Sequence, residues 1–174
     1  MDAEAVVADA REALNALADA LNGYKTKYTD EISKAKAEWD AIVDDYYTKE
    51  LDGGLNQTLA LGIINEFMGD EDIALGSAGS LPGDMQRLFR PKGRGTYHME
   101  YGFSNMGYEV NGALGAKLAK PEAEVYTFCG DGSFLMGHSE LYTAVQEGLK
   151  INVCLFDNLG WGCIENLQNN QGTD

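Results

Sequence analysis

The sequence predicts an α/β fold, in which a parallel β-sheet carries helices on both faces and is preceded by an N-terminal helical segment. From about residue 53 onward, segments with strand character alternate with segments that have helical spacing. The two clearest strand segments, at about 124–129 and 151–156, are continuous apolar runs, which are typical of strands buried in a parallel sheet. Strand–helix–strand alternation of this kind is typical of α/β domains.

Residues 1–52 are predicted to form a helical lead-in or linker. Apolar residues recur at helical spacing in two stripes, which are interrupted at Asn22-Gly23, and Thr29 offers an N-cap for the second helix. The first stripe comprises Val6, Ala10, Ala13, Leu14, Leu17 and Leu21, and the second comprises Ile32, Ala35, Trp39, Ile42, Val43 and Tyr46. We expect this segment to pack on a neighbouring domain. A coiled-coil module is the alternative, but the heptad pattern is too short to favour it.

The second predicted domain covers residues 53–174 and begins where the composition shifts, at Asp52-Gly53-Gly54. Its expected elements are a helix at about 55–68, a strand at 72–77, a short helix started by Pro82, a basic glycine-bearing loop at 90–102, a helix at 105–119, a strand at 124–129, a helix at 138–147 and a strand at 151–156. Only sixteen residues follow Asn158. We therefore expect the sheet to be incomplete at its C-terminal end, and the chain to be a fragment or a truncated version of a longer protein.

Composition and charge argue against several classes of protein. The formal net charge of −15 disfavours nucleic-acid binding, because few basic residues are available to neutralise backbone phosphates. No apolar run is long enough to cross a bilayer, and the acidic N-terminus does not resemble a signal peptide. Three cysteines without a CxxC motif disfavour a disulfide framework or a zinc site. We expect a cytoplasmic protein without a nucleic-acid or membrane partner.

Two predicted strands each end in a small oxygen-bearing side chain with glycine nearby. Asp131 follows the strand at 124–129, and Asn158 follows the strand at 151–156. The connection between them has about the length of one helical crossover, so the two side chains should meet at the carboxyl ends of consecutive parallel strands, where ligands bind. With the main-chain carbonyl of Gly160 they would offer three oxygen ligands to Mg²⁺, which completes its shell with waters and substrate phosphates.

The residues around Asp131 also indicate a phosphate site. Gly130 and Gly132 let the backbone approach a phosphate closely, and Ser133 can donate a hydrogen bond to it. A lone GDG is usually only a turn, and an EF-hand is excluded because the required acidic alternation after Asp131 is missing. The order GDGS, crossover, then asparagine at the next strand end is much more specific. It predicts a cation that anchors a diphosphate.

Longer segments carry a family resemblance. GDGSF followed by HSELYTAVQEGLKINVCLFDN resembles the thiamin diphosphate-binding motif of the acetohydroxyacid synthase and pyruvate decarboxylase superfamily, and YGFSNMGYEVNGALGAKLAKPEAEVYTF is similar to the segment before that motif. NEFMGDEDIALGSAGSLPGDMQRLF, TYHMEYGFSNMGYEVNGALG and FDNLGWGCIENLQ resemble one branch, the cyclic 1,2-dione hydrolases of inositol catabolism. The resemblance runs from about residue 24 to 171. It would correspond to the C-terminal, diphosphate-binding portion of such an enzyme.

The resemblance implies thiamin diphosphate as cofactor and a role for each matching residue. The magnesium ligands would be Asp131, Asn158 and the carbonyl of Gly160, and Asp157 in place of the commoner asparagine leaves Asn158 unchanged. Gly132 and Ser133 would contact the diphosphate from one side, and Ala78, Gly79 and Ser80 from the other. The Ser104 carbonyl and the Met106 amide would bind the aminopyrimidine, and Met106 would lie beneath the cofactor and help to force its V shape.

Some residues near this site keep more than one interpretation. Without the resemblance, Met106 at an apolar helix start would be taken as core filler. His98 is the candidate catalytic acid–base group, because imidazole titrates near neutrality and its loop is expected close to the cofactor. Glu100 shares that loop and is an equally open candidate. His138 is expected to begin a helix.

The reaction implied by the resemblance is hydrolysis of a C–C bond in a cyclic 1,2-dione, from 3D-trihydroxycyclohexane-1,2-dione to 5-deoxy-glucuronate. Two alternatives remain: the diphosphate-binding part of another thiamin diphosphate enzyme, such as a carboligase or decarboxylase, or a non-catalytic assembly module with a vestigial site. In the superfamily a glutamate of a separate pyrimidine-binding domain generates the ylid. No such domain precedes residue 50 in this sequence. We expect the isolated chain to be inactive, and the missing domain to come from the full-length protein or from a partner subunit in a homo-oligomer.

Overall fold

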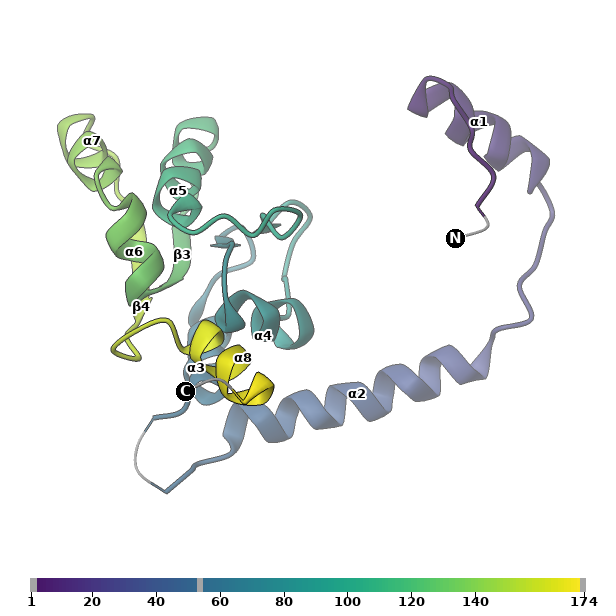
Figure 1. Cartoon of the computed structure of the whole chain (residues 1–174). Coiled ribbons are helices and arrows are strands. Elements are labelled where there is room, and N and C mark those ends of the chain that lie inside the picture. Colours follow the sequence, from purple (N-terminus) through teal and green to yellow (C-terminus); the bar gives the residue numbers. More distant parts are fainter. Residues whose placement is uncertain (1–2, 53–54, 173–174) are drawn as a thin grey trace. The chain divides into compact units, whose positions relative to one another are not determined.

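The computed structural model describes residues 3–52 and 55–172, and Figure 1 labels its helices and strands. The chain divides into two compact units, residues 1–41 and 42–174. The composition shift at Asp52-Gly53-Gly54 falls partly outside the described residues, so the division into 1–52 and 53–174 stays a prediction. Within the described ranges, none of the helices combines the length and the apolar character that crossing a membrane requires.

The N-terminal unit consists of helix α1 (Ala10–Ala20) and the first part of helix α2 (Asp30–Thr48). Asp9 caps α1, since its Oδ1 accepts hydrogen bonds from the amides of Arg11 and Glu12 at 3.0 and 3.3 Å. The two helices are separated at the break that Asn22-Gly23 predicts, where Gly23 takes a left-handed φ of +81°. No residue of α1 is buried, so its apolar stripe remains exposed.

The second unit is built on a four-stranded sheet. Its strands are β1 (Ile73–Gly76), β2 (Tyr97–Met99), β3 (Val125–Gly130) and β4 (Asn152–Phe156). They lie in the order β2-β1-β3-β4, and every neighbouring pair is parallel. The prediction of a parallel sheet is therefore confirmed. Strand β2 was not predicted, because it consists of three residues at a sheet edge inside a segment rich in glycine and basic side chains.

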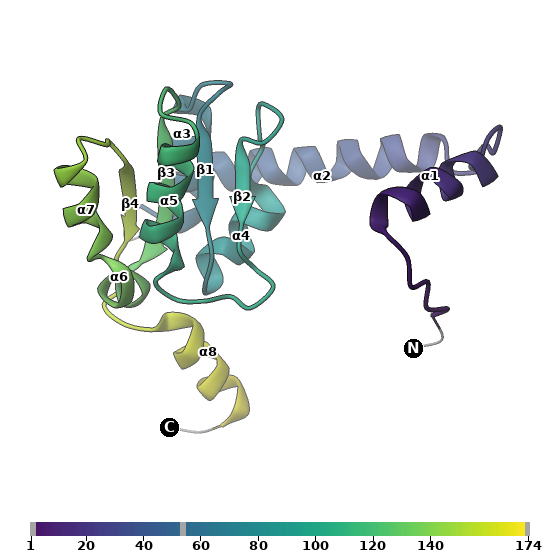
Figure 2. The ribbon, with the colours of Figure 1, turned by 90° about the horizontal axis from the view of Figure 1, so that it is seen from above.

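Helices cover both faces of this sheet, as predicted. They are α3 (Gln57–Phe67), α4 (Ser80–Leu88), α5 (Tyr108–Ala119), α6 (Asp131–Gly137) and α7 (Glu140–Gln146). A further helix, α8 (Gly162–Gln171), follows β4 and has no buried residue. Strand residues that point to one face pack with Leu61 of α3 and Met85 of α4, whereas those on the other face pack with Ala113 of α5. Figure 2 shows α5 and α3 on opposite sides of the strands. Ala74 and Phe128 are among the strand residues on the α3 and α4 side, and Ile73 and Val125 are among those on the α5 side.

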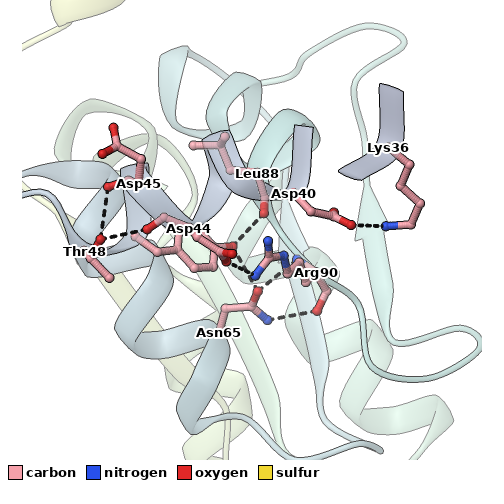
Figure 3. A network of polar contacts seen from close by, with 9 residues as sticks. Lys36, Asp40, Asp44, Asp45, Thr48, Asn65, Leu88 and Arg90 are labelled. Atoms are coloured by element: carbon pink, nitrogen blue, oxygen red, sulfur yellow. Dashed lines mark hydrogen bonds and ion pairs between the residues drawn. The ribbon is translucent and has the colours of Figure 1, made fainter. Parts of the chain in front are cut away.

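The C-terminal part of α2 packs in the second unit through a buried polar network (Figure 3). The Tyr47 hydroxyl lies 2.7 Å from the Leu88 carbonyl oxygen and 3.0 Å from Asn65 Oδ1, and it can donate to either. Asn65 also accepts from the Arg90 amide at 2.9 Å and donates to the Arg90 carbonyl at 3.0 Å. A Cβ at Gly62 would lie 2.6 Å from the Tyr47 ring, so only glycine lets α3 approach α2 this closely.

The structure differs from the sequence prediction after β3. Helix α6 begins directly at Asp131, whereas GDGS was expected to be a loop before a helix at 138–147. His138 closes α6 as its C-cap and does not begin a helix, and α7 follows from Glu140. Helix propensity does not predict this helix, because Gly132 lies in its first turn and glycine is a poor helix former. Helix α8 was also not predicted, since its sequence is largely polar.

Candidate cofactor and metal site

The two strand ends that the sequence singles out are neighbours. Strands β3 and β4 pair in parallel with Gly130 opposite Phe156, so both chains leave the sheet at the same level. Asp131 follows directly, and Asn158 comes two residues after Phe156. Asp131 Oδ1 lies 3.2 Å from a terminal atom of the Asn158 side-chain amide. The structure therefore brings the two residues together as the strand-end argument predicts.

This amide atom of Asn158 also lies 2.7 Å from the Gly160 carbonyl oxygen. If the atom is nitrogen, it donates to both oxygens; if it is oxygen, three acceptors meet with no donor among them. The choice between the two orientations depends on the hydrogen-bond surroundings. A rotation of the amide by 180° thus converts a self-contained hydrogen-bonded cluster into a three-oxygen cluster that suits a hard cation.

The turn that carries Gly160 has an unusual backbone conformation. Leu159 has a left-handed φ of +62°, which is uncommon for a residue with a side chain. Its amide donates to Asp157 Oδ1 at 2.8 Å, so the carboxylate closes a local turn within its own loop. Asp157 therefore helps to hold the loop in which Asn158 and Gly160 meet Asp131, a role that the sequence did not indicate.

The composition of this cluster bears on the kind of metal it could hold. Within residues 3–52 and 55–172, no three or more His, Cys, Asp or Glu side chains are grouped for metal binding. The cluster offers one carboxylate, one amide and one carbonyl oxygen. Such a set does not resemble a zinc site built from cysteine and histidine, and it suits magnesium, which usually needs one or two carboxylates.

A cavity of about 230 Å³ opens beside the cluster. Its lining includes every residue that the sequence proposes for cofactor and metal binding: Ala78, Gly79, Ser80, Ser104, Met106, Gly130, Asp131, Gly132, Ser133, Asn158 and Gly160. His98, the proposed catalytic residue, is not part of this lining. Ligand pockets commonly have roughly 300–1,000 Å³. The cavity is smaller than that range.

The cavity is lined in part by the first residues of helices and by glycines. Helix α4 begins at Ser80, after Gly79 with a φ of +96°, and among the described residues no side chain caps its first amides. Free amides at a helix start favour anions. Gly132 could not be replaced without movement, since a Cβ there would lie 2.0 Å from Trp161 Nε1.

The segment between β2 and α5 is held by Glu100. Its carboxylate accepts hydrogen bonds from the amides of Asn105 and Phe103 at 3.0 and 3.1 Å, and from Ser77 Oγ at 3.1 Å. The Asn105 amide, then the Phe103 amide, lower the pKa of Glu100 below its ordinary value. These bonds fix the loop in which Ser104 takes a left-handed φ of +54°. Glu100 thus stabilises the loop through its hydrogen bonds, a role that its position in the sequence did not reveal.

Met106 and His98 occupy different places. Met106 is 37% exposed and lines the cavity, which argues against the core-filler interpretation. His98 lies on strand β2, not in a loop, and its Nε2 is 2.8 Å from the Tyr108 hydroxyl. It lines a separate cavity beside α5. The structure does not bring His98 to the other predicted site residues, and its catalytic role stays a prediction.

One buried residue beside the cavity was missed by the sequence argument. Glu109, in the first turn of α5, is 1% exposed and accepts hydrogen bonds from Ala78, Gly107 and Ser133. The available signal was a charged residue in an otherwise apolar helical pattern, YEVNGALGAKLA. Sequence alone places such a residue equally well on a solvated face, so the signal was ambiguous.

The fold and this arrangement define a class: an open parallel α/β domain whose ligand cavity lies at the carboxyl ends of its strands. Residues 77–174 match the family described as "Thiamine pyrophosphate enzyme, C-terminal TPP binding domain". The chain belongs to this family.

Similar proteins are known from several bacteria. The chain is 46% identical to a 3D-(3,5/4)-trihydroxycyclohexane-1,2-dione hydrolase of Clostridium tetani, with 99% of this chain and 31% of the relative covered. It is 48% identical to proteins of the same name from Geobacillus thermodenitrificans and Bacillus thuringiensis, with 99% of this chain and 30% and 31% of the relatives covered. The chain thus spans about a third of the length of these relatives.

Proposed function

We propose that this chain is the thiamin diphosphate- and magnesium-binding part of a longer hydrolase that cleaves a C–C bond of a cyclic 1,2-dione in inositol catabolism. The substrate would be 3D-trihydroxycyclohexane-1,2-dione and the product 5-deoxy-glucuronate. Support for the substrate comes from the names of relatives that are 46–48% identical over nearly the whole chain. The same identity disfavours a carboligase or decarboxylase. Support for the cofactor comes from the family to which the chain belongs.

The observation that carries the proposal is the approach of Asp131, Asn158 and the Gly160 carbonyl at one cavity edge. With the Asn158 oxygen turned inward, the three groups would hold Mg²⁺ on one side and leave its other positions to waters and diphosphate oxygens. A cation would also offset the repulsion between the Asp131 carboxylate and an anionic diphosphate.

The opposite side of the cavity suits the diphosphate itself. The α4 start at Gly79 and Ser80 offers backbone amides and the positive end of a helix dipole. Phosphate groups would therefore lie between the start of α4 and the metal ligands.

When bound, thiamin diphosphate supplies a carbon nucleophile and then takes up the electrons of the broken C–C bond. The residues of this chain would bind and orient it. The left-handed conformation of Ser104 turns the backbone next to the cavity, where its carbonyl could accept from an aminopyrimidine. Met106 presents a flexible apolar surface at the same cavity, and it would support the cofactor from below.

The remaining parts of the reaction would come from outside this chain. A pyrimidine-binding domain of the full-length protein, or of a partner subunit in a homo-oligomer, would supply the glutamate that activates the cofactor and would close the cavity. The small cavity volume supports an incomplete site. We propose that the protein works in the cytoplasm on a small-molecule substrate, and that the isolated chain binds the cofactor weakly and does not turn over.

Calorimetric titration tests the proposal. The purified 174-residue chain should give heat with thiamin diphosphate only when Mg²⁺ is present, and Asp131→Asn should lose that heat. Glu147→Gln, an exposed carboxylate after α7, is the matched control and should bind like the unchanged chain. A chain that is folded by circular dichroism but gives no magnesium-dependent heat would overturn the cofactor assignment and favour the vestigial assembly module. Turnover of the dione by the chain alone would overturn the proposed inactivity.

A further inference from the structure

Glu109 is a buried carboxylate with an unusual set of partners. Glutamate is rarely buried unless its charge is compensated or hydrogen-bonded, and Glu109 is only 1% exposed. Its Oε1 accepts from the Ala78 amide at 3.2 Å. Its Oε2 accepts from the Gly107 amide at 3.1 Å and from the Ser133 hydroxyl at 2.7 Å. One carboxylate thus receives three donors.

The three donors come from three separate segments of the chain. Ala78 lies in the turn between β1 and α4, Gly107 follows Met106 at the start of α5, and Ser133 is in the first turn of α6. Each of these segments contributes residues to the cavity lining, whereas Glu109 itself does not line it. Glu109 therefore connects three segments that line the cavity, although its own side chain is not part of the lining.

The contact with Ser133 changes what that residue can do. The Ser133 hydroxyl has a single proton, which it donates to Glu109. It also accepts from the Gly107 amide at 2.8 Å, and that amide shares its one hydrogen between Ser133 Oγ and Glu109 Oε2. Ser133 is 3% exposed, so its hydroxyl is enclosed with both partners. The hydroxyl that the sequence suggests as a phosphate donor is therefore already engaged within the fold.

The backbone of Glu109 is itself fixed. The Thr127 hydroxyl, on β3, donates to the Glu109 carbonyl at 2.9 Å. This bond ties the first turn of α5 to the strand that leads into Asp131. The position of Glu109 relative to the sheet is thus fixed by its backbone, while its carboxylate accepts the three hydrogen bonds.

We propose that Glu109 is a positioning residue that sets the spacing of the three turns which bind the cofactor, and that it withdraws the Ser133 hydroxyl from the diphosphate. The inference rests on the proposed function, because it assigns the purpose of the spacing to thiamin diphosphate binding. Glu109 would act through Ala78, Gly107 and Ser133, and would not touch the cofactor.

The test uses the 174-residue chain with four changes: Glu109→Gln, Glu109→Asp, Ser133→Ala and the control Glu147→Gln. Glu109→Gln keeps the shape but offers one acceptor oxygen, and its amide nitrogen would face a backbone donor. Glu109→Asp keeps the charge but shortens the reach by one methylene. Both should weaken magnesium-dependent thiamin diphosphate binding by about tenfold, as loss of an outer-shell contact commonly does.

Amide hydrogen exchange measured by NMR, without any cofactor, provides a readout apart from binding. In Glu109→Gln the amides of Ala78 and Gly107 should exchange at least about tenfold faster, while core amides such as that of Val125 keep their rates. Ser133→Ala should accelerate Gly107 but not Ala78. In the double variant Glu109→Gln/Ser133→Ala the binding losses should be less than additive, because both changes remove the same contact.

The outcomes separate this inference from the proposed function. If the unchanged chain binds with magnesium while the Glu109 variants bind equally well, the inference is wrong and the function stands. If exchange accelerates uniformly over the whole chain, Glu109 serves general stability and the inference is again overturned. If the unchanged chain shows no magnesium-dependent binding, the proposed function fails, and the inference fails with it.

Discussion

Two asparagines of the second unit, Asn65 and Asn158, have opposite surroundings. Asn65 is 3% exposed, and each end of its amide meets a complementary group: the Arg90 amide and carbonyl, with the Tyr47 hydroxyl nearby (Figure 3). Asn158 is exposed, and one end of its amide lies between two oxygens, Asp131 Oδ1 and the Gly160 carbonyl. The first arrangement is complete within the fold. The second becomes complete only with one amide orientation or with a cation.

The difference suggests how to separate residues that stabilise the fold from residues that bind a ligand. A buried, matched network contributes to folding, and breaking it leaves buried groups unsatisfied. A cluster of acceptors that reaches solvent at Asn158 and Gly160 contributes little to folding, since water can replace its contacts. We therefore expect changes around Asn65 to alter stability but not binding, and changes around Asn158 to do the reverse.

The largest expected effect is on binding at the acceptor cluster. Asp131→Asn removes the only carboxylate of the cluster, and it should weaken magnesium-dependent thiamin diphosphate binding by at least about 100-fold, beyond the usual loss for an outer-shell contact. The free energy of unfolding, measured by urea titration, should change by no more than about 0.5 kcal/mol. If Asp131→Asn lowered the free energy of unfolding strongly but left magnesium-dependent binding unchanged, Asp131 would stabilise the fold and would not bind the ligand.

The matched network should respond in the opposite way. Asn65→Ala leaves the Arg90 amide and carbonyl without their partner, and we expect it to lower the free energy of unfolding by about 2–3 kcal/mol. Magnesium-dependent binding by the folded fraction should stay the same. Asn158→Ala is the matched control, with loss of binding and a stability change of at most about 0.5 kcal/mol. Equal destabilisation by the two alanine variants would contradict the distinction.

Two tyrosines sharpen the comparison within the core. The Tyr47 hydroxyl can donate to the Leu88 carbonyl or to Asn65 Oδ1, whereas the Tyr97 hydroxyl is buried and, among the described residues, has no hydrogen-bond partner. Burial raises the pKa of both hydroxyls to about 12. Tyr47→Phe should cost about 1 kcal/mol of unfolding free energy, the usual net value of a hydrogen bond.

Tyr97→Phe is the control for this loss. It removes a hydroxyl that has no partner within the described part of the chain, and it keeps the ring stacked on Phe89 at a centroid distance of 5.5 Å. We expect the free energy of unfolding to stay unchanged or to rise slightly, because no hydrogen bond is lost. Urea unfolding of both variants under one buffer compares them directly. A larger cost for Tyr97→Phe than for Tyr47→Phe would show that the hydroxyl contacts do not decide stability.

The sequence was sufficient for those parts of the site that topology determines. Parallel strands joined by one crossover must end at the same sheet edge, so Asp131 and Asn158 could be placed together without coordinates. The buried apolar strands likewise indicated the sheet and its two helical layers. These features follow from chain direction and periodicity, which are local properties of the sequence.

The rest depends on contacts between distant segments, which local patterns do not encode. Glu109 receives hydrogen bonds from donors that lie 31 residues before it and 24 residues after it. The local sequence around a buried glutamate of this kind does not differ from that around a glutamate on the surface. Strand β2 exists because β1 accepts it as a partner, not because YHM has a strand pattern. His98 was placed near the cofactor by its loop, but pairing of β2 with β1 carries it to the α5 side.

The smallest effect concerns Glu100, whose contacts are matched like those of Asn65 but lie nearer to solvent. Hydrogen bonds from the Asn105 and Phe103 amides lower the pKa of this carboxyl in the folded chain. Its contribution to stability is therefore fully present above the ordinary pKa of glutamate, and it is lost as the pH falls through the lowered folded pKa. Glu100→Gln should remove this contribution.

We expect the unchanged chain to be slightly more stable than Glu100→Gln at neutral pH, and the difference to shrink on acidification below about pH 4. Urea unfolding at both pH values measures it, with Glu147→Gln as a control that should follow the unchanged chain. A difference that stays constant with pH would mean that the carboxylate charge does not hold this loop. In that case, hydrogen bonds between complementary groups would stabilise the chain only where they are buried, as they are around Asn65.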